Sequence, residues 1–196
     1  MNSAMVMATH TPMPTTVGAA RHSPPRPPAT RRLAEIAPMR DSEMKPPTIP
    51  RFYRELRSVL DRDAIVVTSS GHAQACLLEF PFFYPRTNIT SGGFSTMGFA
   101  YPAALGAKLA APDRQVLSVV GDGDFLMTLQ EMATARQYKI GVVAVVLNNL
   151  GWNSIRDLQM DAFGNDYGFA TEFCSSEGES VTPDFVAAAR SFGLFA

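Results

Sequence analysis

Two apolar runs of strand length dominate the middle of the chain. Gln115–Val120 and Val142–Leu147 are rich in valine, as buried parallel strands usually are. Between them, apolar side chains recur at helical spacing, at Leu126, Leu129, Met132, Ala133 and Tyr138. The pattern predicts a strand–helix–strand unit whose helix starts near Phe125 and is closed by Gly141. Because such units are right-handed, both strands run parallel and their carboxyl ends lie side by side.

Shorter patterns extend this unit in both directions. Two further strands and three helices are predicted, at Ala64–Thr68, Asn88–Thr90, Arg51–Leu60, Phe99–Ala111 and Pro183–Phe192. Thr182 is the expected N-cap of the last helix, with Pro183 in its first turn. Helices that alternate with strands predict an α/β fold, an open and mostly parallel sheet with helices on both faces.

Residues 1–48 lack such a pattern and are predicted to be a disordered or leader segment. The first 50 residues hold ten of the fifteen prolines, which interrupt regular helices and inner strands. No acidic residue precedes Glu35, as in organelle transit peptides, but the prolines would spoil the amphipathic helix that such peptides need. We favour the disordered segment. Residues 49–196 then form the folded domain.

Composition limits the classes of function. The formal net charge is −1, which argues against nucleic acid or an anionic membrane as the main partner. The two cysteines, Cys76 and Cys174, do not have the spacing of a metal site or a disulfide framework. A reducing compartment, the cytoplasm, is therefore expected. The apolar runs are far shorter than a membrane span.

Polar residues follow both central strands at their carboxyl ends. Gly121-Asp122-Gly123 comes after the first strand and Asn148-Asn149 after the second. Ligands of open α/β sheets bind at this edge, where glycines let the backbone N–H groups approach an anion. Asp122 and Asn149 offer the hard oxygen donors that Mg²⁺ prefers. The sequence thus predicts a site for a metal-bound diphosphate.

Gly-Asp-Gly, then 24 residues, then Asn-Asn resembles the signature of thiamine diphosphate (ThDP) enzymes of the acetolactate synthase and pyruvate decarboxylase type. Met97-Gly98 and Pro102–Ala104 fit the same resemblance, which runs from about Arg51 to Ala196. It implies the C-terminal pyrophosphate-binding domain of these enzymes, with ThDP and Mg²⁺ as cofactors. Relatives continue with a strand and a helix, so the sheet is expected to be incomplete at its C-terminal edge.

The resemblance implies a role for three loops. The loop with Ser70, Gly71 and His72 would contact the diphosphate, with the alternative that His72 is an ordinary surface histidine. The carbonyl of Ser95 and the N–H of Met97 would contact the aminopyrimidine ring, and the Met97 side chain would hold the cofactor bent. A packed core methionine is the alternative.

The third loop follows the first central strand. The diphosphate would lie against the backbone there, and the metal ligands would be Asp122, Asn149 and the carbonyl of Gly151; the residues of this turn are Gly121, Asp122, Gly123 and Asp124. Asp124 is expected to be a helix N-cap, in preference to a metal ligand, because a second carboxylate would repel a phosphate.

Two segments outside the signature remain open. The aromatic run Leu77–Pro85 is expected to belong to the core or a subunit interface, with a substrate channel as the alternative. Met160–Phe173 is expected to be a surface connection, with a loop that closes over substrate as the alternative.

Two functions follow from the resemblance. The chain is either the ThDP-binding part of a 2-oxo-acid decarboxylase or acetolactate-synthase-like carboligase, or a truncated module that binds ThDP without turnover. The enzyme would need a pyrimidine domain from a partner chain or a second copy, because that domain supplies the glutamate that activates the cofactor. A nicotinamide-binding Rossmann domain is disfavoured because Leu126 stands where the third glycine of its fingerprint belongs.

Overall fold

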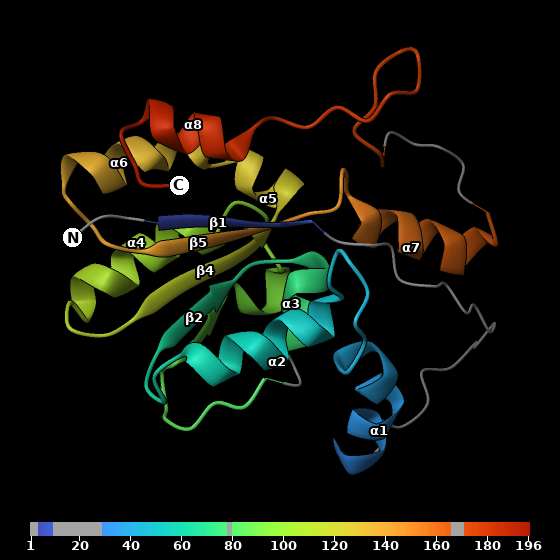
Figure 1. Cartoon of the computed structure of the whole chain (residues 1–196), viewed down its shortest axis with the longest axis horizontal. Coiled ribbons are helices and arrows are strands. Elements are labelled where there is room, and N and C mark those ends of the chain that lie inside the picture. The colour runs from blue at the N-terminus through green and yellow to red at the C-terminus, as the bar shows by residue number, and fades with distance from the viewer. Residues whose placement is uncertain (1–3, 10–28, 78–79, 166–170) are drawn as a thin grey trace.

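The computed structural model describes residues 4–9, 29–77, 80–165 and 171–196. A five-stranded sheet crosses the molecule in the order β1-β5-β4-β2-β3, and each neighbouring pair is parallel (Figure 1). Its strands are β1 (Ala4–Thr9), β2 (Ile65–Thr68), β3 (Asn88–Thr90), β4 (Val116–Gly121) and β5 (Val143–Asn148). The predicted α/β class with a parallel sheet is confirmed, and the two central strands start and end within one residue of their predicted bounds.

Helices cover both faces of the sheet (Figure 1). The α-helices are α1 (Ala29–Arg40), α2 (Ile49–Val59), α3 (Gly71–Leu77), α4 (Ala100–Ala110), α5 (Asp122–Leu126), α6 (Met132–Gln137), α7 (Asn153–Phe163) and α8 (Phe185–Ser191), with short 3₁₀ turns η1 (Gly92–Phe94) and η2 (Leu129–Glu131). Residues of α4, α5, α6 and α8 share one core cluster with alternate strand positions, and residues of α2 and α3 share the other.

The strand sequences explain this double burial. In β4, Val119 and Val120 are 0% and 1% exposed and belong to opposite core clusters. Successive side chains of a strand point to opposite faces, so a strand that is covered on both sides must be apolar at nearly every position. This double burial explains why the valine-rich runs predicted β4 and β5 from the sequence.

The expectation that residues 1–48 form no regular structure is wrong for two segments. The strand β1 pairs in parallel with β5, from Ala4 opposite Val143 to Thr9 opposite Asn148. The helix α1 packs beside α2, and Thr48 Oγ1, which caps α2, donates to the Met39 carbonyl at 2.5 Å. Residues 1–3 and 10–28 lie outside the described part. The incompleteness of the sheet on its C-terminal side stays a prediction.

The predicted helix between the central strands is interrupted. It begins at Asp122, not near Phe125, and breaks at Thr128, whose φ of −140° is not helical. The C-terminal end of the helix also differs from the prediction that Gly141 closes it. Lys139, with φ 56°, adopts the left-handed conformation there. The Ile140 N–H then bonds the Ala135 carbonyl at 2.9 Å, as in a Schellman motif.

The C-terminal part shows two further differences. Asp184, not Thr182, caps α8, because its Oδ1 accepts from the Ala187 N–H at 2.9 Å. The segment expected as a surface connection starts inside α7, which runs to Phe163, while residues 166–170 lie outside the described part. Of the aromatic run, Phe80 is buried in the core, as expected, and Tyr84 is exposed. No helix among the described residues is long and apolar enough to cross a membrane.

Candidate functional site

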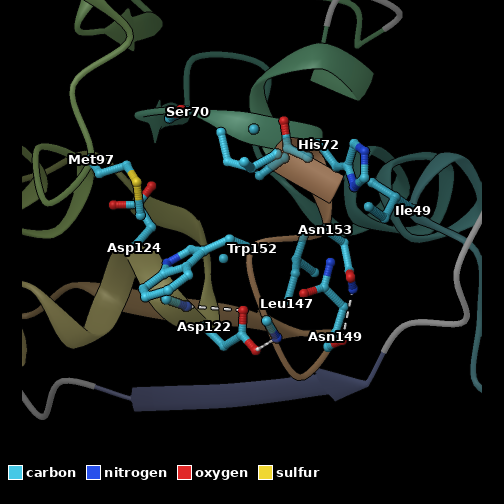
Figure 2. A pocket seen from close by; sticks show the side chains of 17 residues that line it. Ile49, Ser70, His72, Met97, Asp122, Asp124, Leu147, Asn149, Trp152 and Asn153 are labelled. Atoms are coloured by element: carbon cyan, nitrogen blue, oxygen red, sulfur yellow. Dashed lines mark hydrogen bonds between the residues drawn. The ribbon is translucent and has the colours of Figure 1, made fainter. Parts of the chain in front are cut away.

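A pocket opens at the carboxyl ends of β2, β4 and β5, with about 550 Å³ of empty space that includes its open mouth (Figure 2). The structure brings ten of the eleven predicted cofactor residues to its wall, namely Ser70, Gly71, His72, Met97, Gly121, Asp122, Gly123, Asp124, Asn149 and Gly151. Met97 and Asp124 lie at one side, His72 at the other, and Trp152 between them (Figure 2). The parallel register explains the meeting of distant segments, because it aligns Gly121 of β4 with Leu147 of β5.

Asp122 is the buried carboxylate of the site, with 1% of its surface exposed. Its Oδ1 accepts from its neighbour Gly123 N–H at 2.9 Å, and its Oδ2 accepts from the Gly151 N–H at 3.1 Å. Burial raises the pKa of the Asp122 carboxyl, and these N–H donors oppose part of that rise. The side chain therefore links the turn after β4 to the turn after β5 and places a carboxyl group at the pocket wall.

Two glycines of these turns allow neighbouring segments to approach closely. A Cβ on Gly123 would lie 2.2 Å from Trp152 Nε1, and a Cβ on Gly151 would lie 2.3 Å from the Thr171 carbonyl oxygen. Trp152 is held in place by an edge-on contact with Phe173, with ring centroids 5.0 Å apart. Any larger residue at position 123 would displace the Trp152 indole from its position at the pocket wall.

The paired asparagines divide two tasks. Asn148 Oδ1 accepts from the Leu150 N–H at 3.2 Å, and its Nδ2 donates to Thr182 Oγ1 at 3.3 Å. Asn149 Oδ1, by contrast, is buried and has no hydrogen-bond partner among the described residues. The backbone carbonyl of Asn149 accepts from Asn153 Nδ2 at 2.8 Å. One asparagine thus stabilises the turn, and the other presents an unused amide oxygen at the pocket wall.

The loop after β2 differs from the expected open loop, since α3 already begins at Gly71. Gly71 has φ +71°, a conformation that glycine adopts without strain. His72 Nε2 lies 2.8 Å from Asp157 Oδ2 of α7, so the histidine is not an ordinary surface residue. Its Nδ1 is buried and has no partner in the part of the chain that the structure describes.

The loop before α4 holds Ser95 and Met97. Ser95 has φ 49°, and its Oγ donates to Gln74 Oε1 at 2.6 Å. It is the one predicted cofactor residue that is absent from the described pocket wall. Met97 does line the pocket, and Figure 2 shows its side chain opposite His72, across the indole of Trp152.

The expectation that Asp124 is a helix N-cap is wrong. Gly121 occupies the cap position of α5, and Asp124 lies inside that helix with 5% of its surface exposed. Its Oδ1 accepts from the Gly98 N–H at 2.5 Å and its Oδ2 from the Ser69 hydroxyl. Burial raises the pKa of the Asp124 carboxyl, and these donors oppose the rise. The five-residue helix also adds a smaller dipole than the long helix that the sequence predicts.

Sequence reasoning did not assign several residues of the wall, which are Ile49, Ala73, Leu147, Trp152, Asn153, Ser154 and Ile155. Asn153, Ser154 and Ile155 begin α7, and the Asn-Asn turn immediately before them was the signal available in the sequence. Ile49 comes from α2, and no motif connects it with the site. Among the described residues, no three or more His, Cys, Asp or Glu side chains gather into a metal-binding group.

Comparisons with known proteins agree with this geometry. A family model described as "Thiamine pyrophosphate enzyme, C-terminal TPP binding domain" matches residues 69–195. The chain belongs to this family. The resemblance inferred from the Gly-Asp-Gly and Asn-Asn signature is thereby confirmed, and thiamine pyrophosphate, which is ThDP, is the cofactor of the family.

The individual relatives include acetolactate synthase large subunits. A probable acetolactate synthase large subunit of Methanocaldococcus jannaschii is 38% identical over 167 residues, 80% of this chain and 27% of that protein. Acetolactate synthase isozyme 3 large subunit of Escherichia coli is 40% identical over 132 residues, 67% of this chain and 22% of that protein.

A solved structure is similar as well. The thiamine diphosphate-dependent 4-hydroxybenzoylformate decarboxylase of Rhodococcus jostii superposes with a TM-score of 0.61 and 28% identity, over 73% of this chain and 26% of that one. The chain therefore spans about a quarter of the length of the relatives it matches.

Proposed function

We propose that the pocket binds ThDP through a Mg²⁺ ion held by Asp122, Asn149 and the backbone carbonyl of Gly151. All three come from the two turns that meet at the ends of β4 and β5. One carboxylate with neutral amide and carbonyl oxygens is a hard-oxygen set suited to Mg²⁺, which also binds substrate phosphates and water. The neutral ligands limit the negative charge beside a diphosphate.

The buried Oδ1 of Asn149 is the observation that carries the metal proposal. A buried acceptor without a partner destabilises a fold by roughly 1–3 kcal/mol. This loss of stability is expected at a binding site, where a bound group interacts with the atom. An amide oxygen can coordinate a metal ion such as Mg²⁺. The neighbouring Asn148 has both polar atoms engaged, so the two residues are a contrast within one turn.

The remaining contacts of the cofactor would come from the other loops. Backbone N–H groups near Ser70, Gly71 and Asp124 are proposed to bind the diphosphate, with His72 as a further donor. His72 lines the pocket, its Nε2 lies 2.8 Å from Asp157 Oδ2, and its buried Nδ1 has no partner among the described residues. Met97 would support the ring system, and the backbone carbonyl of Ser95 would contact its amino group.

The proposed reaction is decarboxylation of a 2-oxo acid or a carboligation like that of acetolactate synthase. Bound ThDP would supply the carbanion stabilisation that such bond changes next to a carbonyl carbon require. We infer that a pyrimidine domain, from another chain or another copy, completes the site. Binding of ThDP without turnover is the second candidate, since the only carboxylates among the described residues of the pocket wall, Asp122 and Asp124, both accept hydrogen bonds from the chain's own loops.

Titration of the full chain with ThDP, with and without Mg²⁺, tests the proposal. Trp152 is the single tryptophan of the chain and lines the pocket, so its fluorescence reports on the site directly. We expect saturable quenching by ThDP that requires Mg²⁺ and disappears in Asp122→Ala. Saturable NADH binding, with no Mg²⁺-dependent response to ThDP, would contradict the proposal and favour a nicotinamide-binding domain.

A further inference from the structure

The carboxylate of Asp124 lies where three cofactor loops meet. Its Oδ1 accepts from the Gly98 N–H at 2.5 Å, and its Oδ2 accepts from the Ser69 hydroxyl. Ser69 directly follows β2 and precedes the Ser70–His72 loop, and Gly98 follows Met97 directly. Asp124 itself follows the Asp122-Gly123 turn. One side chain thus joins the three segments that surround the pocket, and Figure 2 shows it between Met97 and Trp152.

Both backbone polar groups of Gly98 are hydrogen-bonded to side chains. Thr128 Oγ1 donates to the Gly98 carbonyl at 3.2 Å, while the Gly98 N–H is held by Asp124. Gly98 has φ +78°, and a Cβ there would lie 3.1 Å from Thr128 Cγ2, so the peptide after Met97 has little freedom. Thr128 lies at the break in the helix, where its φ of −140° is not helical.

We propose that Asp124 is a positioning residue that holds the Met97–Gly98 peptide against the diphosphate turn and so sets the affinity for the ring part of the cofactor. The inference rests on the proposed function. A carboxylate suits the task because its two oxygens accept from two different loops at once, whereas a serine hydroxyl at this position offers one short oxygen. With its oxygens engaged by Ser69 and Gly98, Asp124 is separate from the metal ligands.

The inference predicts a selective loss of affinity. In Asp124→Asn the amide nitrogen meets one of the two donors, so one contact is lost while the other is kept. We expect the dissociation constant of Mg–ThDP to rise about tenfold or more, as for loss of a hydrogen bond to a charged group. The constant of Mg–pyrophosphate should stay within about twofold, because Asp122 and Asn149 are unchanged. Asp124→Ala should show a larger selective loss than Asp124→Asn.

Isothermal titration of the full chain with both ligands measures this split. Asp113→Asn is the matched control, since Asp113 is exposed on the turn after α4 and outside the pocket wall, and it should bind both ligands as the wild type does. If Asp124→Asn does not fold, Ser69→Ala removes one donor to the same carboxylate and should show a smaller loss of the same selectivity.

The outcomes separate the inference from the proposed function. If the wild type binds no Mg–ThDP, the proposed function is wrong. If the wild type binds it, but the Asp124 or Ser69 variants lose affinity for both ligands equally or for neither, the proposed function stands and the positioning role is wrong.

Discussion

Asn148 and Asn149 are adjacent in the sequence and have opposite environments. The side chain of Asn148 is 3% exposed and makes hydrogen bonds at both ends, whereas the Asn149 Oδ1 is buried without a partner among the described residues. A single sequence does not distinguish them, because both are asparagines after a buried strand. The geometry of the turn, with Leu150 at φ 64°, distinguishes them. Asn148 stabilises the turn, and Asn149 is the proposed metal ligand.

This contrast gives a prediction for two alanine variants. Asn149→Ala should weaken Mg²⁺-dependent ThDP binding roughly tenfold or more, at least the effect of losing an outer-shell partner of a metal. Without ligand it should unfold no more easily than the wild type, because it removes an unpaired buried acceptor. Asn148→Ala should instead lower the free energy of unfolding by about 1 kcal/mol through its lost hydrogen bonds. Calorimetric binding and denaturant unfolding measure both effects, and equal stability losses in the two variants would contradict the division of tasks.

Gly123 gives a second prediction at this scale. In Gly123→Ala the new methyl would meet the Trp152 indole at 2.2 Å, so the ring must move at a cost of about 1–3 kcal/mol. We expect an altered tryptophan emission spectrum without ligand and weaker ThDP binding. Gly106→Ala is the matched control, because no neighbouring segment lies within 4 Å of a Cβ there and Gly106 is outside the pocket wall. An unchanged spectrum in Gly123→Ala would show that the indole does not rest on this glycine.

At the scale of elements, the sequence pattern predicted the strands correctly but not the helix break or the helix cap. The strands β4 and β5 are buried on both faces, so their apolar runs alone locate them. The helix breaks at Thr128, whose hydroxyl donates to the carbonyl of Gly98, thirty residues earlier in the chain. The cap of α8 passes to Asp184 while Thr182 accepts from the distant Asn148. These differences arise from tertiary contacts that periodicity does not record.

The packing of α4 on α5 gives a pH prediction. Tyr101 is 2% exposed and meets Phe125 edge-on with centroids 5.3 Å apart. Burial, with the Glu131 carboxylate adding to it, raises the pKa of Tyr101 from 10.0 to about 12. The folded state thus holds the phenol proton more tightly than the unfolded state. The associated stability is complete below pH 10 and is lost as the pH rises toward about 12.

Tyr101→Phe should remove this slope. The difference in the free energy of unfolding between wild type and variant should be constant from pH 7 to pH 9 and shrink above about pH 10. Denaturant unfolding across this range measures it, and absorbance near 295 nm follows the phenol itself. Tyr138→Phe is the control, since Tyr138 is 66% exposed. A constant difference at every pH would contradict a buried neutral phenol.

For the whole molecule, the largest difference between prediction and structure is the N-terminal segment. Residues 1–50 are rich in proline, which predicts an irregular segment, yet Ala4–Thr9 contains no proline, is apolar at every position but Thr9, and pairs with β5. Its partner is the strand that carries the Asn-Asn turn, far along the chain. A short strand without flanking turn signals has no local periodicity to identify it. The candidate site was predictable because its residues lie in the turns of a recognisable motif.

The carboxylates of the pocket wall decide whether the chain itself could protonate the cofactor ring. Of the described residues that line it, only Asp122 and Asp124 carry carboxylates, and both accept hydrogen bonds from the chain's own loops. Asp122 faces the proposed metal, and Asp124 holds the loop of Met97. Neither is therefore suited to give a proton to the ring of the cofactor. That proton would come from a residue outside the described wall, and a pyrimidine domain is the proposed source.

The prediction is that turnover requires that domain. The purified chain with ThDP, Mg²⁺ and pyruvate should release no carbon dioxide above background, although Trp152 fluorescence reports bound cofactor. Adding a separately produced pyrimidine domain of an acetolactate-synthase-like enzyme should restore release, because its acid would then face the cofactor ring across the interface. The same mixture with Asp122→Ala should stay inactive, which separates assembly from cofactor binding. Turnover by the chain alone would mean that Asp122, Asp124 or a residue outside the described wall supplies the proton, and the requirement for a second domain would be wrong.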